Sequence, residues 1–531
     1  MAFQRNGRSR NGRTAGASGA GRRSLIAAVG AATAALILAA CAAGPAAPAG
    51  AGENNDRDVV LRWGVSSSFA NWDPIQTGST ASTRFLTPIY ESLLSLDEEG
   101  NIAPGLAESY EYNDAGDAVT FHIRQGATFH DGTPVDAAAV KAFIDRAKEQ
   151  EGSHLAGDYD SIDHVTVEDE HTVTVHLKQV DHQIPYLLNV RGALITSPTA
   201  AEDPETLNVS NPVGAGPFKV VELVPESRVV LEKFEDYWDA DNIHIDRIEI
   251  ELGIDQSTLV TALQTGVYDF AIINAPFVQQ AQDAGLDVWF GDEYAWFVQF
   301  INLNVNKEPF DDPAVVEAFK HAIDREELVE KITYGYGDVT HQPFPRGYIA
   351  FDEESESIWP YDPERSRQIL ADAGYAPGEV KATLVISNDN PAAVIIQQQL
   401  AEVGIDIEIE IDTNWRVKYY GKELALSLFQ YFGRDSHVQA LTAHYDFNGV
   451  LNLSAPYVHE DFTEALRIVR ETPIDAPEYA ERLREATRAG VETSSKIPYL
   501  TQPSYYAKSP KVSDPPKIQG QLSWKGVTVE E

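Results

Sequence analysis

The chain has 531 residues, and its 81 acidic residues against 41 basic ones give a formal net charge of −40 at pH 7. A field of that sign repels phosphate backbones and anionic lipid surfaces, which argues against nucleic acid as a partner. The sequence contains one methionine, Met1, and one cysteine, Cys41. It therefore cannot form an internal disulfide.

Residues 1–40 have the pattern of an export signal. Six arginines and no acid flank an apolar run from Leu25 to Ala40, which is too short and too rich in small residues for a membrane span. The run ends in Leu38-Ala39-Ala40-Cys41, which resembles the lipobox of bacterial lipoproteins. The resemblance implies cleavage before Cys41 and acylation of its sulfur, which would anchor the protein to the outer face of the cell membrane. Arg22-Arg23 leaves twin-arginine export open beside the general route.

Residues 41–57 are rich in Ala, Gly and Pro and then in Asn and Asp, which predicts a flexible tether. Cleavage would remove six of the 41 basic residues and leave 35 against 81 acidic ones, a formal charge of −46. The full sequence is 43% hydrophobic, and the chain that remains after cleavage is long enough for two or three lobes with cores of their own.

Strand and helix patterns alternate from Val59 onward. Apolar or alternating segments predict strands at 59–65, 119–124, 171–177, 383–386 and 406–411. Helical spacing joins Val140 to Ala147 and Val315 to Ile323, and a further helix is predicted over Ala392 to Val403. The order predicts an α/β protein with a mixed sheet in each lobe.

Several motifs in a fixed order resemble the extracellular solute-binding proteins of family 5, which serve ABC importers of peptides, nickel and related solutes. The motifs include Pro104-Gly105-Leu106-Ala107-Glu108-Ser109-Tyr110, Phe129-His130-Asp131-Gly132-Thr133-Pro134-Val135, Pro212-Val213-Gly214-Ala215-Gly216-Pro217-Phe218, Pro309-Phe310-Asp311-Asp312 and Tyr361-Asp362-Pro363-Glu364. Their glycines and prolines fix turns, so they identify the fold and say little about the ligand.

The resemblance implies a two-lobed, periplasmic-binding-protein-like α/β fold of type II, in its large peptide-binding subclass. Lobe I would cover 58–301 with an inserted subdomain at about 97–211, lobe II would cover 302–499, and 500–531 would return to lobe I. The strands near 300–303 and 499–502 would then be the hinge, and the ligand would be enclosed between the lobes.

The same resemblance implies a monomeric, cofactor-free binding lipoprotein. It would capture a small solute, a peptide or another amine-bearing compound, and pass it to the permease and ATPase of an ABC importer. A nickel or metal-chelate binding protein of the same family is the alternative, and a purely structural surface lipoprotein is a further one. A secreted hydrolase is more remote, because residues 41–531 contain no Gly-x-Ser-x-Gly or His-Glu-x-x-His motif and no cysteine nucleophile besides the lipobox residue.

Two candidate ligand contacts lie in the predicted first lobe. Ser67, Ser68 and Phe69 follow the first strand, where hydroxyls and backbone amides can meet a polar ligand, with ordinary loop solvation as the alternative. Arg191 is a lone cation between apolar stretches. In the nickel-binding relatives an arginine at the aligned place holds a chelator's carboxylate, whereas a structural ion pair is the alternative here.

The other candidates lie at or beyond the predicted hinge. In peptide-binding relatives an aspartate three residues after an aromatic pairs with the ligand's terminal ammonium. Phe432 and Asp435 fit that spacing, although the Asp-Pro that often follows is missing, so a surface aspartate stays open. Trp296 and Trp415 are candidate lining aromatics, with core packing as the alternative. Trp72 is interpreted as a core residue.

Three histidines lie in one stretch of the predicted second lobe, at His437, His444 and His459. None stands at a close helical pair spacing with another, and no cysteine is near to complete a ligand set. The pattern indicates scattered surface histidines rather than a metal site.

Overall fold

The computed structural model describes residues 58–69, 71–77, 82–291, 296–388, 390–433, 436–455, 457–518 and 521–530. Within these ranges no helix combines the length and the apolarity that crossing a bilayer requires. The predicted signal peptide, tether and lipidation residue, at 1–40, 41–57 and Cys41, lie outside the described residues.

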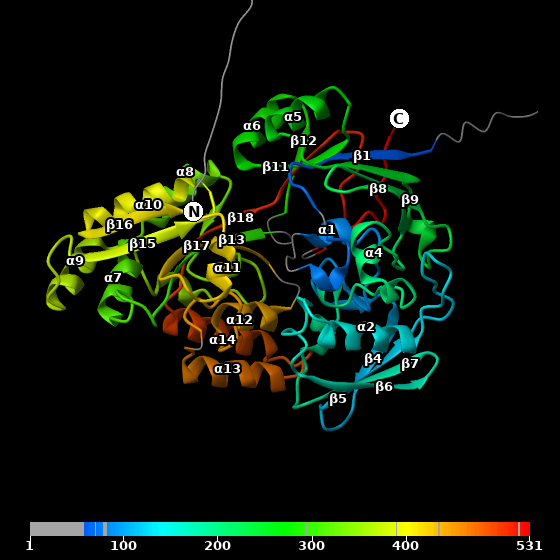
Figure 1. Ribbon diagram of the computed structural model, residues 1–531, viewed down its shortest axis with the longest axis horizontal. Helices are drawn as coiled ribbons and strands as arrows, with labels where there is room; N and C mark the ends of the chain where they lie inside the picture. Colours follow the sequence, from blue (N-terminus) through cyan, green and yellow to red (C-terminus); the bar gives the residue numbers. More distant parts are fainter. Residues whose placement is uncertain are drawn as a thin grey trace, which may run out of the picture. The chain divides into compact units, whose positions relative to one another are not determined.

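The first lobe is built on a mixed sheet around the strand predicted at 59–65. β1 (Val60–Gly64) pairs in parallel with β10 and β11, and the side chains of Leu61 and Trp63 are fully buried. The described strands run in the order β12-β19-β11-β1-β10-β9-β8, and Figure 1 labels β1, β8, β9, β11 and β12 of this sheet. Their bounds are Phe218–Val224 (β8), Arg228–Lys233 (β9), Arg247–Glu251 (β10), Phe270–Ile273 (β11), Asp287–Phe290 (β12) and Tyr505–Lys508 (β19).

Aromatic packing joins distant parts of the chain in the core of this lobe. The ring of Trp63 stacks on Phe85, with 5.3 Å between centroids, and meets Trp524 edge-on at 5.7 Å. Phe270 lies 5.1 Å from Trp524. Trp72 is also buried, as the sequence predicts. Each such ring stabilises the fold by about 1.5–3 kcal/mol through burial, so the segment around Trp524 is held firmly in the first lobe.

An antiparallel sheet with a separate core forms within the predicted insertion. Its strands run in the order β4-β5-β7-β6 and span Ala107–Tyr112 (β4), Ala118–Ile123 (β5), Ile162–Asp169 (β6) and Thr172–Leu177 (β7). Helix α2 (Ala137–Glu149) begins where the Asp136 carboxylate accepts a hydrogen bond from the backbone N–H of Ala139 at 2.8 Å. It buries Val140, Phe143, Ile144 and Ala147 against this core, which confirms the predicted helical face and both predicted strands.

The second lobe has its own mixed sheet, which confirms the predicted sheet type. The described strands run in the order β14-β18-β13-β17-β15-β16, and β15 pairs in parallel with β16 and β17 while the other pairs are antiparallel. Their bounds are Trp296–Leu303 (β13), Asp338–Val339 (β14), Val380–Ile386 (β15), Ile405–Ile411 (β16), Leu426–Phe432 (β17) and Ile497–Pro503 (β18). The predicted strands at 383–386 and 406–411 are confirmed.

Two groups of helices belong to the second lobe (Figure 1). The first packs on its sheet and comprises α7 (Pro313–Ala322), α8 (Arg325–Thr333), α9 (Pro363–Asp372), α10 (Pro391–Glu402) and α11 (Trp415–Tyr420). The second comprises α12 (His437–Tyr445), α13 (Glu460–Glu471) and α14 (Tyr479–Thr493), and it approaches the subdomain of the first lobe. The predicted helices at Val315 to Ile323 and Ala392 to Val403 are confirmed.

Shorter elements complete the first lobe. They are α1 (Thr83–Leu86), α3 (Ile184–Leu187), α4 (Pro204–Val209), α5 (Gln256–Gln264), α6 (Val278–Asp283), β2 (Leu94–Leu96) and β3 (Ile102–Pro104).

The chain passes between the two large sheets twice, at neighbouring places. β12 ends at Phe290 before β13 begins, and Ser504 alone separates β18 from β19. Phe290 pairs with Tyr505 in the first sheet, whereas Trp296 pairs with Pro503 in the second. The lobe boundaries expected after residues 301 and 499 fall inside β13 and β18. Both strands pair along their lengths within the second sheet.

Candidate functional site

A cavity of about 330 Å³ opens between the two large sheets beside Ser504. The first lobe contributes Val65, Ser66 and Ser67 from the end of β1 and residues 272–276 from the end of β11. The second lobe contributes side chains from β13, β17 and β18. Loops at the carboxyl ends of parallel strands are where open α/β sheets bind ligands. We call this space the crossover cavity.

The rim of the crossover cavity is fixed by hydrogen bonds. Gln256 donates its side-chain N–H to the Ser66 hydroxyl at 2.7 Å and to the carbonyl of Ile272 at 3.3 Å. Its side-chain oxygen accepts the backbone N–H of Asn274 at 3.1 Å. One glutamine therefore locks the loops after β1 and β11 together.

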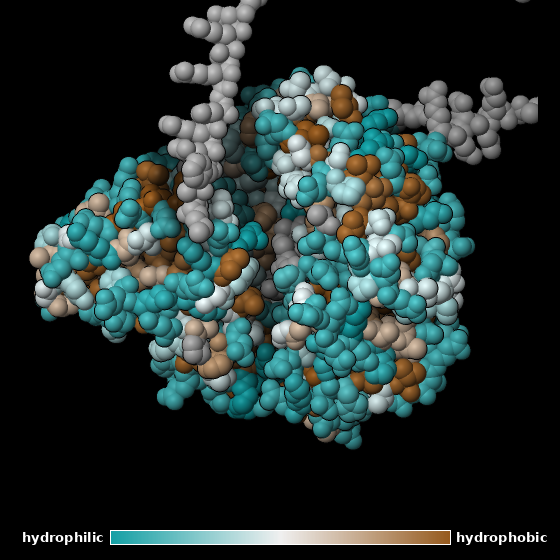
Figure 2. Space-filling view, in the orientation of Figure 1, coloured by the Kyte–Doolittle hydropathy of each residue, from teal (hydrophilic) through white to brown (hydrophobic). Residues whose placement is uncertain are grey.

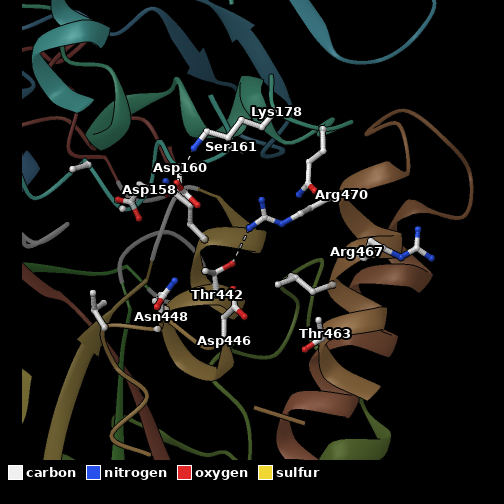
Figure 3. Close-up of a pocket in the computed structure, with 18 of the residues that line it drawn as sticks. Asp158, Asp160, Ser161, Lys178, Thr442, Asp446, Asn448, Thr463, Arg467 and Arg470 are labelled. Carbon is white, nitrogen blue, oxygen red and sulfur yellow. Dashed lines mark hydrogen bonds and ion pairs between the residues drawn. The ribbon is translucent and has the colours of Figure 1, made fainter. Parts of the chain in front are cut away.

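A larger cavity of about 930 Å³ separates the subdomain of the first lobe from helices α12 and α13 of the second (Figure 3). Residues from the segments 153–161 and 178–180 line it on one side, and residues from the segments 439–450 and 463–471 line it on the other. The lining contains both acidic and basic side chains, and the Lys178 ammonium lies 3.0 Å from a carboxylate oxygen of Asp160. On the face in view in Figure 2, a groove runs between the lobes and most of the surrounding surface is hydrophilic. We call this space the large cavity.

A buried ion pair joins the lobes beside the large cavity. Arg470 of α13 donates to the carboxylate of Asp181 at 2.9 Å and to the hydroxyl of Thr442 at 3.3 Å. The side chain of Asp181 is 3% exposed and that of Arg470 is 22% exposed. Because both groups are largely buried, loss of one partner would leave the other charge unpaired in a low-dielectric setting. The pair therefore strongly favours the observed contact between the lobes.

Neutral hydrogen bonds reinforce this contact. The backbone N–H of His182 donates to the carbonyl of Arg470 at 2.8 Å. The hydroxyl of Tyr479 donates to the side-chain oxygen of Gln183 at 2.6 Å, and both residues are buried. The lobes thus meet in the structure at α13 and α14.

The predicted serine loop divides between solvent, cavity and core. Ser67 lines the crossover cavity, and Ser68 is exposed. Phe69 is buried, with its ring stacked 4.9 Å from Phe85 and edge-on to Trp72 at 4.8 Å. Of the three, Ser67 is the one that the structure brings to a cavity wall.

Arg191 is buried in an ion pair. Its guanidinium donates to the carboxylate of Asp158 at 2.5 Å and to the carbonyl of His154 at 3.2 Å, and the side chain is 5% exposed. Asp158 and His154 line the large cavity, whereas Arg191 lies behind them. This arrangement fits the structural ion pair that the sequence left open as the alternative.

The aromatic candidates separate in the same way. Trp415 is buried and packs edge-on to Phe429 at 5.4 Å, within the core of the second lobe. Phe432 ends β17, and its ring lies 4.8 Å from Phe297 at the edge of the crossover cavity. Asp435 and the side chain of Trp296 lie outside what the structure describes.

The interpretation of His437 and His444 as surface residues is wrong. Both are buried, because α12 packs them among aromatic rings. His437 lies 4.7 Å from Tyr186 of the first lobe, and His444 lies 4.6 Å from Tyr431. Only His459 of the three is partly exposed. Within the described ranges, no group of three or more His, Cys, Asp or Glu residues is arranged to hold a metal ion.

Sequence reasoning missed Arg84, Asp181 and Arg470. Arg84 lines the crossover cavity, and its sequence signal, a lone cation before an apolar run, is the same kind that pointed to Arg191. Asp181 and Arg470 carry no motif, since they come from segments 289 residues apart.

Comparison with known proteins identifies relatives over most of the chain. Residues 101–450 match the model of the bacterial extracellular solute-binding proteins, family 5 middle. The glutathione-binding protein GsiB of Shigella flexneri serotype 5b is 32% identical over 360 residues, which cover 66% of this chain and 69% of that protein. The GsiB of Escherichia coli O157:H7 is 33% identical over 360 residues, with the same coverage.

Solved structures share the two-lobed fold. The periplasmic binding protein DppA from Helicobacter pylori, in complex with the peptide STSA, has a TM-score of 0.79 at 22% identity and covers 89% of this chain and 99% of its own. NikZ from Campylobacter jejuni, in complex with Ni(L-His), has a TM-score of 0.75 at 18% identity and covers 88% of this chain and 99% of its own. At these identities the likeness shows the fold alone.

Replacing Arg470 by Ala is expected to weaken the contact between the lobes by about 3–5 kcal/mol, because Asp181 would stay buried without its cation. The matched control is Arg467→Ala on the same helix. Its side chain is 50% exposed and pairs with Glu464 and Glu471, so we expect a much smaller loss, because solvent screens exposed ion pairs. Urea unfolding and the radius of gyration in solution scattering measure both effects. Equal behaviour of the two variants would contradict the role of the buried pair.

Acid is expected to destabilise the contact around His437. Burial lowers the pKa of His437 to about 3, whereas an exposed histidine titrates near 6.5. As pH falls below about 6.5, the imidazole of residue 437 becomes protonated in the unfolded chain but stays neutral in the folded one. The free energy of unfolding therefore falls by up to about 1.4 kcal/mol per pH unit until pH approaches 3.

Urea titrations between pH 7 and pH 4 measure this dependence in wild type, His437→Gln and the partly exposed control His459→Gln. Burial also lowers the pKa of His130 to about 4 and that of His341 to about 3, so wild type should lose stability steeply. His437→Gln should have a shallower slope by one proton. An unchanged slope in that variant would show that His437 does not titrate as its burial requires.

Proposed function

Because the chain belongs to the bacterial extracellular solute-binding proteins of family 5, we propose that its solute is a short peptide of about the size of glutathione. The protein would pass this peptide to the permease and ATPase of an ABC importer. The observation that supports this most is the 33% identity over 360 residues with a glutathione-binding protein.

The placement of the cavities is consistent with capture between lobes. Both spaces are walled by residues of the two lobes, so a solute inside either one gains its full set of contacts only when the lobes are together. Binding would then shift the population toward the closed form. We place the hinge at the two crossings, after Phe290 and at Ser504, with 58–290 and 505–531 as lobe I and 296–503 as lobe II.

The solute proposal is tested by native mass spectrometry of the protein as purified, followed by calorimetry with glutathione, trialanine and Ni²⁺ with L-histidine. We expect one peptide per protein, retained without fragmentation. If calorimetry gives a dissociation constant of about 1 µM for the peptide, its standard free energy of binding is about −8 kcal/mol. Binding of the nickel complex but of neither peptide would replace the peptide with the chelate as the solute. Fragmentation of the peptides would favour the hydrolase instead.

We also propose that the protein is exported, acylated on Cys41 and monomeric. The pattern Leu38-Ala39-Ala40-Cys41 supports the anchor. Each buried methylene of an acyl chain contributes about 0.8 kcal/mol, so more than one chain on a single residue would hold the protein stably.

Replacing Cys41 by Ala is expected to abolish palmitate labelling and to release the protein from the membrane fraction. Because Cys41 is the only cysteine in the sequence, any label on the wild-type protein through a thioether reports on this one site. Light scattering of the detergent-solubilised protein measures the oligomeric state. Labelling of the Ala variant at the wild-type level would refute the anchor.

A further inference from the structure

The sheet of the subdomain exposes two histidines that face each other across neighbouring strands. His164 of β6 pairs with His176 of β7 in the antiparallel register, and their imidazole rings are stacked with centroids 4.3 Å apart and planes inclined by 6°. The other face of this sheet packs on α2 in the buried core, so the pair lies on the outer face, at the periphery of the molecule (Figure 1). The side chain of His164 is 56% exposed. Neither histidine lines the crossover cavity or the large cavity.

The hydrogen bond of His164 decides which ring nitrogen carries its hydrogen. Its Nδ1 lies 2.8 Å from a carboxylate oxygen of Asp163. This hydrogen bond lowers the pKa of Asp163, so the carboxylate is ionised at neutral pH and can only accept. Nδ1 therefore carries the hydrogen, and in the neutral ring Nε2 keeps its lone pair.

The hydrogen bonds of His176 lead to the same result through a hydroxyl. Thr166 donates its hydroxyl hydrogen to the carboxylate of Glu168 at 2.8 Å. The Thr166 oxygen lies 3.0 Å from Nε2 of His176, and it can only accept there because a hydroxyl has a single hydrogen to give. Nε2 of His176 therefore carries the hydrogen, and Nδ1 keeps its lone pair in the neutral ring.

Two imidazoles oriented in this way have the properties of metal ligands. A neutral imidazole binds a transition-metal ion through one nitrogen, while its other N–H donates to an acceptor that fixes the tautomer. Here the acceptors are Asp163 and the hydroxyl of Thr166, which Glu168 holds in turn. A formal charge of −40 also attracts cations to the molecule. Within the described ranges no group of three His, Cys, Asp or Glu residues is arranged to hold an ion, so water would complete the coordination.

The stacked rings need one rotation to share an ion. The lone pairs of imidazole nitrogens lie in the planes of the rings, so those of two parallel rings do not converge on one point. Turning one ring out of the stack brings the two nitrogens toward a common ion, and exposed side chains change rotamer within nanoseconds. The backbone pairing of the two strands keeps the rings within reach of each other throughout.

We propose that His164 and His176 form a surface site for one divalent transition-metal ion, with Cu²⁺ bound more tightly than Ni²⁺ or Zn²⁺. That order follows from the general affinity of nitrogen ligands for these ions, and Mg²⁺ should not compete because it prefers oxygen ligands. The site lies apart from both cavities, so it is independent of the proposed solute and adds a second binding activity to the chain.

Calorimetry with Cu²⁺ tests the site in the full chain carrying Cys41→Ala, because the sequence then has no thiol that could bind the ion. This parent protein should bind Cu²⁺, and electron paramagnetic resonance of the bound ion should show coupling to imidazole nitrogen. His164→Gln and His176→Gln should each weaken binding about tenfold or more, because each removes one of the two protein ligands. Ni²⁺ and Zn²⁺ should bind the parent more weakly than Cu²⁺, and excess Mg²⁺ should not displace Cu²⁺.

The matched control is His122→Gln. His122 lies on the same face of the sheet, on β5, with its side chain 46% exposed and Glu111 3.9 Å away, but it stands opposite Thr172 rather than another histidine. This variant should keep the affinity of the parent. An equal loss in His122→Gln, or an affinity for Cu²⁺ that survives replacement of both His164 and His176, would overturn the pair as the site.

Chemical modification of the parent protein gives a second readout that requires no variant to fold. Diethyl pyrocarbonate acylates accessible imidazoles, and mass spectrometry locates the acylated residues. Cu²⁺ should protect His164 and His176 and leave His122 reactive. Equal protection of all three histidines, or of none, would contradict the assignment. Because both readouts use Cu²⁺ alone, neither depends on whether the proposed solute is correct.

Discussion

Two neighbouring crossings of the chain constrain everything else in this structure. β13 and β18 are paired strands in the second lobe, and their continuations β12 and β19 are adjacent to one another in the first. The lobes are therefore covalently joined along one line and at no other described place. Such a connection restricts relative motion to rotation about that line. Groups close to the line, such as those of the crossover cavity, stay near both lobes during rotation, whereas groups far from it separate.

The lobes also touch away from that line, through contacts at α13 and α14. The Arg470–Asp181 pair and the Tyr479–Gln183 hydrogen bond join the lobes through protein groups, without a ligand. A buried ion pair is weak evidence for net stability, because desolvation opposes the Coulomb attraction. It is specific in geometry, however, and so it fixes which faces of the lobes meet. A solute then only needs to add the contacts that favour this arrangement over an open one.

The sequence predicted a mixed sheet in each lobe, several of the strands and helices, and the family, because apolar periodicity and turn residues act locally. It did not predict where the chain passes from one sheet to the other, before β13 and after β18, since the apolar pattern of a strand does not show which sheet the strand joins. The candidate site was less predictable. Arg84 and Arg191 look alike in the sequence, and only the fold shows that Arg191 meets Asp158, 33 residues away, while Arg84 faces a cavity. His437 and His444 were misjudged because rings from distant segments surround them.

If a solute closes two hinged lobes, the distance between the lobes must change when it binds, and this distance can be measured with and without solute. With Cys41 replaced the body has no thiol, so Val224→Cys in the first lobe and Val417→Cys in the second, both at exposed positions, can each carry one spin label. We expect a broad distance distribution after the solute is stripped by unfolding and refolding. We expect a narrow, displaced distribution when the extracted solute is returned. Identical distributions in the two states would contradict closure by the solute.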